Sequence, residues 1–208
     1  MKHSIYLILL FLACFACTKD DIDEKQEQDF DITSDYYFAA IIDGEETLIQ
    51  HNVEWYGNGT SSGGGTTPNG YQQNQGMFFI KGLTPNYSAG VVILKNFPDR
   101  PSECSQMDAM FHMGSYPFGL TSLSTEENGK DGIMVFCVDA DGVSWSTDKA
   151  PATQSGSSFE ITEYIDFEDA YSSKIMKAKF NCMLYDGKGH SKTLTKGEIR
   201  SKCLYCYY

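Results

Sequence analysis

The sequence predicts an all-β fold with an antiparallel sheet, on three observations. Short runs of β-branched and aromatic residues recur along the chain and are separated by turn residues. Aromatic residues make up 13% of the 208 residues and glycine occurs 19 times, while leucine-rich helical heptads are absent. Residues 173–186 alternate between apolar and polar side chains, as a strand with one buried face does. The spacing of strands and turns predicts an antiparallel β-sandwich, immunoglobulin-like or jelly-roll-like, with long loops.

The first expected strands come from the region before residue 96. Residues 36–43 (YYFAAIID) are apolar and end at Gly44, which marks a turn. Residues 57–76 contain almost no aliphatic side chain and are rich in glycine, so we expect a long flexible loop there. The other expected strands of this region are residues 47–56, 77–81 (MFFIK) and 91–95 (VVILK).

The middle of the chain is the least regular part. Three prolines interrupt residues 96–123, so this segment cannot form one continuous element, and we expect at most a short helix over residues 105–113. Residues 133–139 (IMVFCVD) and 143–147 (VSWST) flank an Asp-Gly pair, which predicts a hairpin with a type I′ turn. Trp145 shares a face with Val143 and is expected in the core.

Two further strands and a final hairpin are expected at the C-terminal end. Residues 158–167 alternate, with Phe159 and Ile161 directed inward. Lys196-Gly197 is expected to be a turn that divides residues 190–208 into a final hairpin. The clearest strand, residues 173–186, places four apolar side chains on one face: Ala178, Phe180, Cys182 and Leu184.

The N-terminal segment has the pattern of an export signal. Residues 1–16 begin with a weakly basic tip and continue into an uncharged run, IYLILLFLACF, which is shorter than the about 20 residues that span a bilayer. This pattern predicts a signal peptide over residues 1–16. Residues 17–34 are acidic and polar, and we expect them to form a tether. Residues 35–208 are then one domain, long enough to bury a core.

The end of the apolar run resembles a bacterial lipobox, in which a cysteine is lipidated after signal-peptide cleavage. Two cysteines follow an alanine, Cys14 and Cys17, and we favour Cys17 because it lies between apolar and charged sequence. Neither has the preferred leucine three positions earlier, and a plain signal peptide with an incidental cysteine is the alternative. Several acyl chains anchor a protein firmly, since each buried CH₂ contributes about 0.8 kcal/mol.

The residues after Cys17 resemble a second sorting signal. The stretch CTKDDI is similar to the signal that sends Bacteroidota lipoproteins to the outer face of the outer membrane. Three further stretches resemble small β-sandwich lipoproteins of Bacteroidota: YYFAAIIDGEE, VDADGVSWSTD and SKIMKAKFNCMLYDGKGHSKTLTKGEIRSKCLY. These resemblances imply a fold and a cell-surface location in the outer membrane, and they imply no activity.

Charge and cysteine content narrow the possible partners. The formal net charge is −12 and the chain lacks a basic cluster, so nucleic acid is not an expected partner. The cysteines of the expected domain are odd in number, so they cannot all pair within one chain. Buried thiols, or one disulfide to Cys182 or Cys137, both remain open, and the CxxC at residues 203–206 lacks the second ligand pair of a zinc site. The five cysteines are Cys104, Cys137, Cys182, Cys203 and Cys206.

The sequence offers no catalytic or metal-binding constellation. Residues 59–63 match G-x-S-x-G formally, but a glycine tract follows where a nucleophile elbow needs a helix. Asp139 and Asp141 are the metal candidates because the stretch DADG resembles the start of a calcium loop. No glutamate closes that loop, and a hairpin turn explains the same residues. We therefore expect a protein without cofactor or metal that is not an enzyme.

Aromatic side chains near the irregular segments are the candidate ligand contacts. Trp55 and Tyr56 precede the glycine-rich stretch, Tyr71 lies within it, and Tyr116 lies beside a proline. Exposed aromatic rings can stack on sugars or anchor a protein partner. The expected function is a non-enzymatic module of a surface lipoprotein, binding glycans for nutrient capture. The alternatives are a protein-binding adhesion or assembly module and, third, a hydrolase.

Overall fold

The structure, a computed structural model of the chain, describes residues 30–81, 87–102, 109–119, 131–149, 154–167 and 173–204. The expected signal peptide, the lipidation site Cys17 and most of the acidic tether lie outside the described residues. The last residues of the expected tether contact the domain, since the Thr33 and Ser34 N–H groups donate to Gln50 Oε1 at 2.7 and 3.0 Å. In the described residues, no helix has the length and hydrophobicity to cross a membrane.

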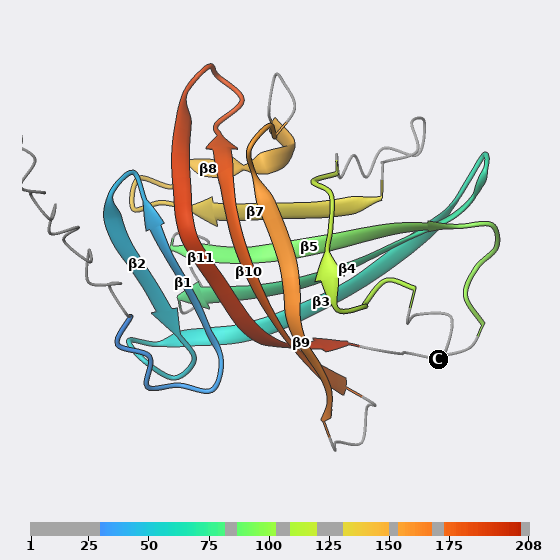
Figure 1. Cartoon of the computed structure of the whole chain (residues 1–208), viewed down its shortest axis with the longest axis horizontal. Helices are drawn as coiled ribbons and strands as arrows, with labels where there is room; N and C mark the ends of the chain where they lie inside the picture. The colour runs from blue at the N-terminus through green and yellow to red at the C-terminus, as the bar shows by residue number, and fades with distance from the viewer. Residues whose placement is uncertain are drawn as a thin grey trace, which may run out of the picture.

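The described chain is all-β and antiparallel, as predicted (Figure 1). Nine strands follow one path in the order β2-β1-β11-β10-β8-β7-β5-β4-β3, and β9 pairs with β10 and with β6. The strands are β1 (Tyr37–Ile42), β2 (Glu45–Gln50), β3 (Tyr56–Thr67), β4 (Gly70–Lys81), β5 (Ser88–Phe97), β6 (Gly114–Ser115), β7 (Gly132–Val138), β8 (Ser144–Ser146), β9 (Ser158–Phe167), β10 (Ser173–Tyr185) and β11 (Ser191–Leu204), with a 3₁₀ turn at Thr147–Lys149.

The sheet curls strongly into a half-barrel, where the sequence analysis expected a sandwich. Long, twisted strands stay paired along a single path, so the sheet bends round onto its own face and does not separate into two clear layers. Near the start of β3 the curl brings distant strands together, and Asn58 Nδ2 donates to Ser201 Oγ of β11 at 2.8 Å. The core therefore lies on the concave face of one curled sheet.

The alternation of β10 fills this concave face as predicted. Ala178, Phe180, Cys182 and Leu184 are all buried. Phe159 and Ile161 of β9 are buried too, and the Phe159 ring stacks on Phe180 with centroids 5.6 Å apart. Phe38 of β1 lies on the same side of the core as Phe180, with ring centroids 5.8 Å apart. The wall opposite is formed by residues of β4, β5 and β7, among them Met77, Phe79, Val91, Ile93 and Val135.

The glycine-rich stretch expected as a loop is instead most of a long hairpin, β3 and β4. Its strands pair from Tyr56–Lys81 to Thr67–Gly70. The glycines make room for rings of the opposite strand, because a Cβ at Gly59 would lie 2.3 Å from Phe78. The prediction was wrong because hydrophobic periodicity is the main strand signal, and a glycine strand that accepts a neighbour's rings shows none.

Two other local predictions were wrong. Lys196-Gly197 is a bulge inside the continuous strand β11, with Lys196 at φ 50°, and no second hairpin forms there. The hairpin expected around Asp141-Gly142 does form, since β7 pairs with β8, but its turn has only Gly142 at positive φ (76°), whereas a type I′ turn needs two such residues. Of the expected helix over residues 105–113, the described residues 109–113 are not helical, and the rest lies outside the described residues.

Candidate functional site

The half-barrel holds a cavity at one end of its concave face. We call it the mouth cavity; its volume is about 540 Å³. One wall is β2, the facing wall is formed by the start of β5 and the end of β7, and Tyr56 and Lys192 lie at its sides. A cavity of this size fits a ligand the size of a small sugar or a drug-like molecule.

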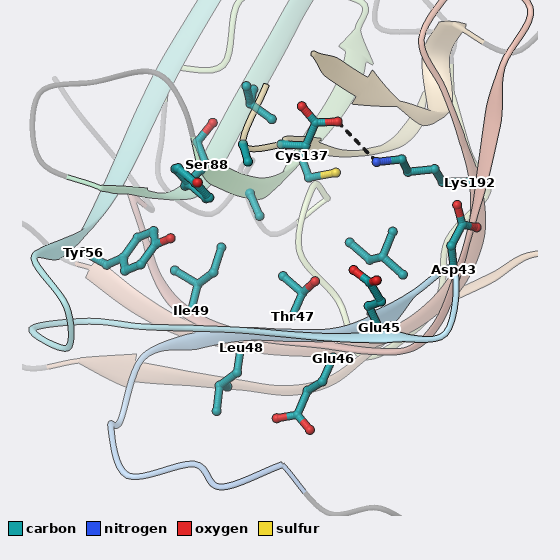
Figure 2. A pocket seen from close by; sticks show the side chains of 16 residues that line it. Asp43, Glu45, Glu46, Thr47, Leu48, Ile49, Tyr56, Ser88, Cys137 and Lys192 are labelled. Atoms are coloured by element: carbon teal, nitrogen blue, oxygen red, sulfur yellow. Dashed lines mark hydrogen bonds and ion pairs between the residues drawn. The ribbon is translucent and has the colours of Figure 1, made fainter. Parts of the chain in front are cut away.

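Strand β2 gives the cavity an apolar floor and a polar edge. Figure 2 shows the side chains of Glu45, Thr47 and Ile49 on the cavity side of the strand. Glu46 and Leu48 also line the cavity, but their side chains point to the other side. This alternation follows from the two-residue period of a strand. Ile49 is buried, whereas Glu45 is exposed at the opening. The side chains from β2 therefore grade from apolar at depth to acidic at the entrance.

The wall opposite β2 is fixed by Asp139. Its Oδ2 accepts hydrogen bonds from Trp145 Nε1 at 2.7 Å and from Lys192 Nζ at 3.2 Å, the latter drawn as a dashed line in Figure 2. Its Oδ1 accepts from the Val143 N–H at 2.9 Å. Burial opposes ionisation of Asp139, but these hydrogen bonds and the charge of Lys192 outweigh it and lower its pKa.

This arrangement gives Asp139 and Asp141 a structural explanation that needs no metal. Asp139 is engaged by protein donors, and the Asp141 N–H also donates to its Oδ1 at 3.2 Å. Asp141 itself is exposed. No group of three or more His, Cys, Asp or Glu side chains suited to a metal ion occurs in the part of the chain that the structure describes.

Two tyrosines and a lysine form the aromatic edge of the mouth cavity. Tyr56 and Tyr87 both line it, and Lys81 Nζ lies 5.3 Å from the ring centroid of Tyr56 and 5.5 Å from that of Tyr87. Lys81 also pairs with Glu54 at 3.4 Å. Burial raises the pKa of Tyr56, and the nearby Glu54 and Tyr87 raise it further, so Tyr56 keeps its hydroxyl proton at neutral pH. The edge thus presents ring faces and a neutral phenol.

The backbone around this edge adopts unusual conformations. Of the described non-glycine residues, six have positive φ, and four of these are Asn52, Glu54, Trp55 and Tyr87. Trp55 has φ 68° and its side chain is 88% exposed. A bulky residue in this region is strained, and such strain concentrates at binding and catalytic sites. Trp55 therefore projects into solvent next to the cavity at a cost to the stability of the fold.

The other two aromatic candidates lie elsewhere. Tyr71 pairs with Thr66 near the tip of the hairpin, ten positions along the strands from the Tyr56–Lys81 pair, which is about 33 Å. Tyr116 is held by its neighbours, since its hydroxyl donates to the Met110 carbonyl at 3.0 Å and its ring stacks on His112. The structure thus brings Trp55 and Tyr56 to one site and leaves Tyr71 and Tyr116 outside it.

The described cysteines are free thiols. Cys137, Cys182 and Cys203 are buried and unpaired with one another, while Cys104 and Cys206 lie outside the described residues. Burial raises the pKa of Cys137 to about 11 and that of Cys182 and Cys203 to about 12. Cys137 lines the mouth cavity as a protonated, weakly polar group.

Several cavity residues were not among the sequence candidates. Thr47 and Ile49 belong to the strand expected over residues 47–56, whereas Glu45 and Tyr87 lie outside the expected strands. Residues 45–49 (EETLI) show no alternation of apolar and polar side chains, and the sequence does not reveal which strands lie opposite. Trp145 was expected in the core and is buried there.

Comparison with protein-family models, curated proteins and solved structures finds no match for this chain. The geometry of the mouth cavity and the N-terminal sequence are therefore the features that bear on function.

Proposed function

We propose that this chain is a lipid-anchored lipoprotein on the outer face of the outer membrane, whose half-barrel binds a carbohydrate in the mouth cavity without catalysis. The anchor follows from the resemblance of residues 1–22 to lipoprotein export signals. The binding role rests on one observation: an amphipathic cavity whose aromatic edge is built on strained backbone, with Trp55 held exposed beside it.

The chemistry of the lining suits a sugar better than an apolar ligand. A pyranose has an apolar face that can stack on an aromatic ring and a rim of hydroxyls that need donors and acceptors. Tyr56 and Tyr87 supply rings, and Glu45 and Asp43 supply charged acceptors at the opening. Thr47 adds a hydroxyl on the same side, as Figure 2 shows. A purely hydrophobic ligand would leave the carboxylates desolvated and unpaired.

A non-enzymatic role is supported by the surroundings of the described histidines. The ring of His51 accepts the Asn58 N–H, that of His112 contacts Tyr116, and that of His190 pairs with Asp186 at 2.6 Å. A nucleophilic serine or cysteine needs a base within hydrogen-bond reach. The G-x-S-x-G stretch lies within strand β3, which lacks the strand-turn-helix setting of a nucleophile elbow.

A protein partner is the second candidate, and the exposure of Trp55 favours it. Tryptophan is enriched among the residues that dominate protein–protein binding energies. A tryptophan that is 88% exposed beside a cavity could anchor a partner outside the cavity as well as a sugar within it. This would make the chain an adhesion or assembly module.

Two adjacent glutamates offer a matched test. The full chain is probed on an array of soluble polysaccharides, and binding is compared for wild type, Glu45→Gln, Glu46→Gln and Trp55→Ala. The Glu45 side chain points to the cavity side of β2 and the Glu46 side chain to the other side. Each substitution removes one charge from the same strand, so Glu46→Gln is a matched control for Glu45→Gln. We expect Glu45→Gln to weaken binding about tenfold or more, because a charged acceptor is lost, and Glu46→Gln to leave it within about twofold.

The outcomes separate the two candidates. Sugar binding that depends on Glu45 and not on Glu46 supports the carbohydrate proposal. Equal effects of both glutamates would place the ligand outside the mouth cavity. Absence of binding to every polysaccharide, together with Trp55-dependent binding of a purified surface protein, would replace the proposal with the second candidate.

A further inference from the structure

Strand β3 is the unpaired end of the half-barrel sheet. It pairs with β4 alone and has no partner strand on its other side in the described chain. The hairpin of β3 and β4 also extends to the end of the molecule far from β2 (Figure 1). A strand edge of 12 residues presents a row of backbone donors and acceptors that another strand can use.

The outward-pointing groups can be assigned from Asn58. Its N–H donates to His51 Nδ1, which lies outside the β3–β4 ladder, so the Asn58–Phe79 pair is a non-hydrogen-bonded pair. In an antiparallel ladder the backbone N–H and C=O groups of every second residue then point away from the partner strand. Those residues are Thr60, Ser62, Gly64 and Thr66. Within the described residues, their backbone groups have no hydrogen-bond partner.

Charge distinguishes this edge from the other edge of the sheet. The whole hairpin from Tyr56 to Ile80 contains no charged residue, in a chain whose net charge is −12. The opposite edge, β2, begins with Glu45 and Glu46. Natural sheets protect their edges with charged residues and prolines, and β2 has such protection while β3 has none.

We propose that β3 is a self-association edge, through which two copies of this chain pair β3 to β3 in antiparallel fashion about a two-fold axis near Ser62. A second copy is the occupant favoured by charge, because two acidic bodies can approach closely only where both are neutral. With the axis at Ser62, Thr60 faces Gly64 of the second copy and Ser62 faces itself, so three outward-pointing residues of each copy pair. Thr66 faces Asn58, whose N–H already donates to His51. The Ser62–Ser62 pair adds a favourable cross-strand contact.

The test compares three substitutions at one position. Ser62 Oγ accepts hydrogen bonds from Gln73 at 3.0 Å and Gln75 at 2.8 Å, so Ser62→Pro and Ser62→Ala both lose these two bonds. Only proline also removes the outward N–H and places a ring on the edge, which an edge strand tolerates. Ser62→Lys keeps the N–H and places like charges opposite one another across the axis. Association of the full chain is measured by sedimentation equilibrium in density-matched detergent at an excess of micelles.

We expect wild type and Ser62→Ala to form dimers, and we expect Ser62→Pro and Ser62→Lys to dissociate at least about tenfold more readily. Thermal unfolding followed by circular dichroism checks that the variants are folded. If Ser62→Pro does not fold, Ser62→Lys tests the interface in its place. A wild type that stays monomeric up to about 100 µM would overturn the proposal. Dimers of equal strength in all folded variants would also overturn it, because the interface would then lie away from β3.

Discussion

The Asp139 side chain connects the end of β7 to two other strands beside the mouth cavity. It lies at the end of β7, accepts from Trp145 of β8 and pairs with Lys192 of β11. Lys192 Nζ also lies 4.3 Å from the ring centroid of Trp145. One carboxylate thus joins three strands and fixes the turn that follows β7. Residues 139–142 (DADG) resemble the start of a calcium loop because calcium loops and tight turns both use short carboxylate side chains beside a glycine.

Replacing this carboxylate should destabilise the fold. We expect Asp139→Ala to lower the free energy of unfolding by about 1–3 kcal/mol, because Trp145 Nε1 and Lys192 lose their acceptor in a partly buried position. The control is Asp141→Ala, which removes an exposed carboxylate from the same turn and should cost no more than about 0.5 kcal/mol. Urea denaturation measures both. Stabilisation of the wild type by calcium that is lost in either variant would instead indicate a metal site.

The destabilisation should depend on pH in a defined direction. The pKa of Asp139 is lower in the folded protein than in the unfolded chain, so ionised Asp139 stabilises the fold above its unfolded pKa of about 4. This contribution is lost as the pH falls through the lowered pKa. The difference in unfolding free energy between wild type and Asp139→Ala should therefore be largest near pH 7 and should narrow below pH of about 4. A difference that grows on acidification would contradict this assignment.

Among the strands, β10 and β3 show what the sequence could and could not predict. β10 was predicted because its apolar residues alternate, and its buried face is the one expected. β3 was missed because its glycines carry no pattern of their own, and its conformation depends on rings contributed by β4. Gly64 illustrates this, since a Cβ there would lie 2.6 Å from the hydroxyl of Tyr71. Pairing with a distant strand, which local sequence does not encode, decides such a segment.

The mouth cavity could be predicted only in part for the same reason. Trp55 and Tyr56 were identified because they precede a glycine-rich stretch that was expected to be a loop, where exposed aromatic rings can contact a ligand. Glu45 and Lys192 belong to strands far apart in sequence, and the curl of the sheet decides that both reach the cavity. The half-barrel itself could not be distinguished from a sandwich, because both need the same alternating strands and differ in how far one sheet bends.

Two glycines on either side of β4, Gly90 of β5 and Gly65 of β3, give a test of strand packing. A Cβ at Gly90 of β5 would lie 2.3 Å from the Met77 carbonyl oxygen and 2.9 Å from Phe78 Cα, both backbone atoms that cannot move aside. We expect Gly90→Ala to lower the free energy of unfolding by at least about 2 kcal/mol. Gly65 of β3 has open space around the Cβ position, so Gly65→Ala should be neutral or up to about 1 kcal/mol stabilising. Thermal denaturation compares the two; equal effects would contradict the close packing of β5 on β4.

At the scale of the whole molecule, the hairpin of β3 and β4 both borders the mouth cavity, through Tyr56, and provides the free edge of β3. Tyr56 begins β3 at the cavity, and the tip of the hairpin lies at the other end of the strand. In the proposed pairing about Ser62, the tip from one copy lies beside the start of β3 of the other copy. Self-association would then place a second chain next to the exposed Trp55, where it could complete or restrict the entrance to the cavity.

The location of the molecule depends on Cys17, and this can be tested directly. If Cys17 carries the acyl chains, wild type should be labelled by palmitate, fractionate with the outer membrane and be cut by protease added to intact cells. Cys17→Ser should lose the label and leave the membrane fraction, because the buried CH₂ groups supply the free energy of anchoring. Cys14→Ser, a change of the same size three residues earlier, should leave all three readouts unchanged.

Label that is lost in Cys14→Ser and kept in Cys17→Ser would move the anchor to Cys14. A labelled wild type that protease reaches only in broken cells would place the half-barrel on the inner side of the membrane, away from any external carbohydrate.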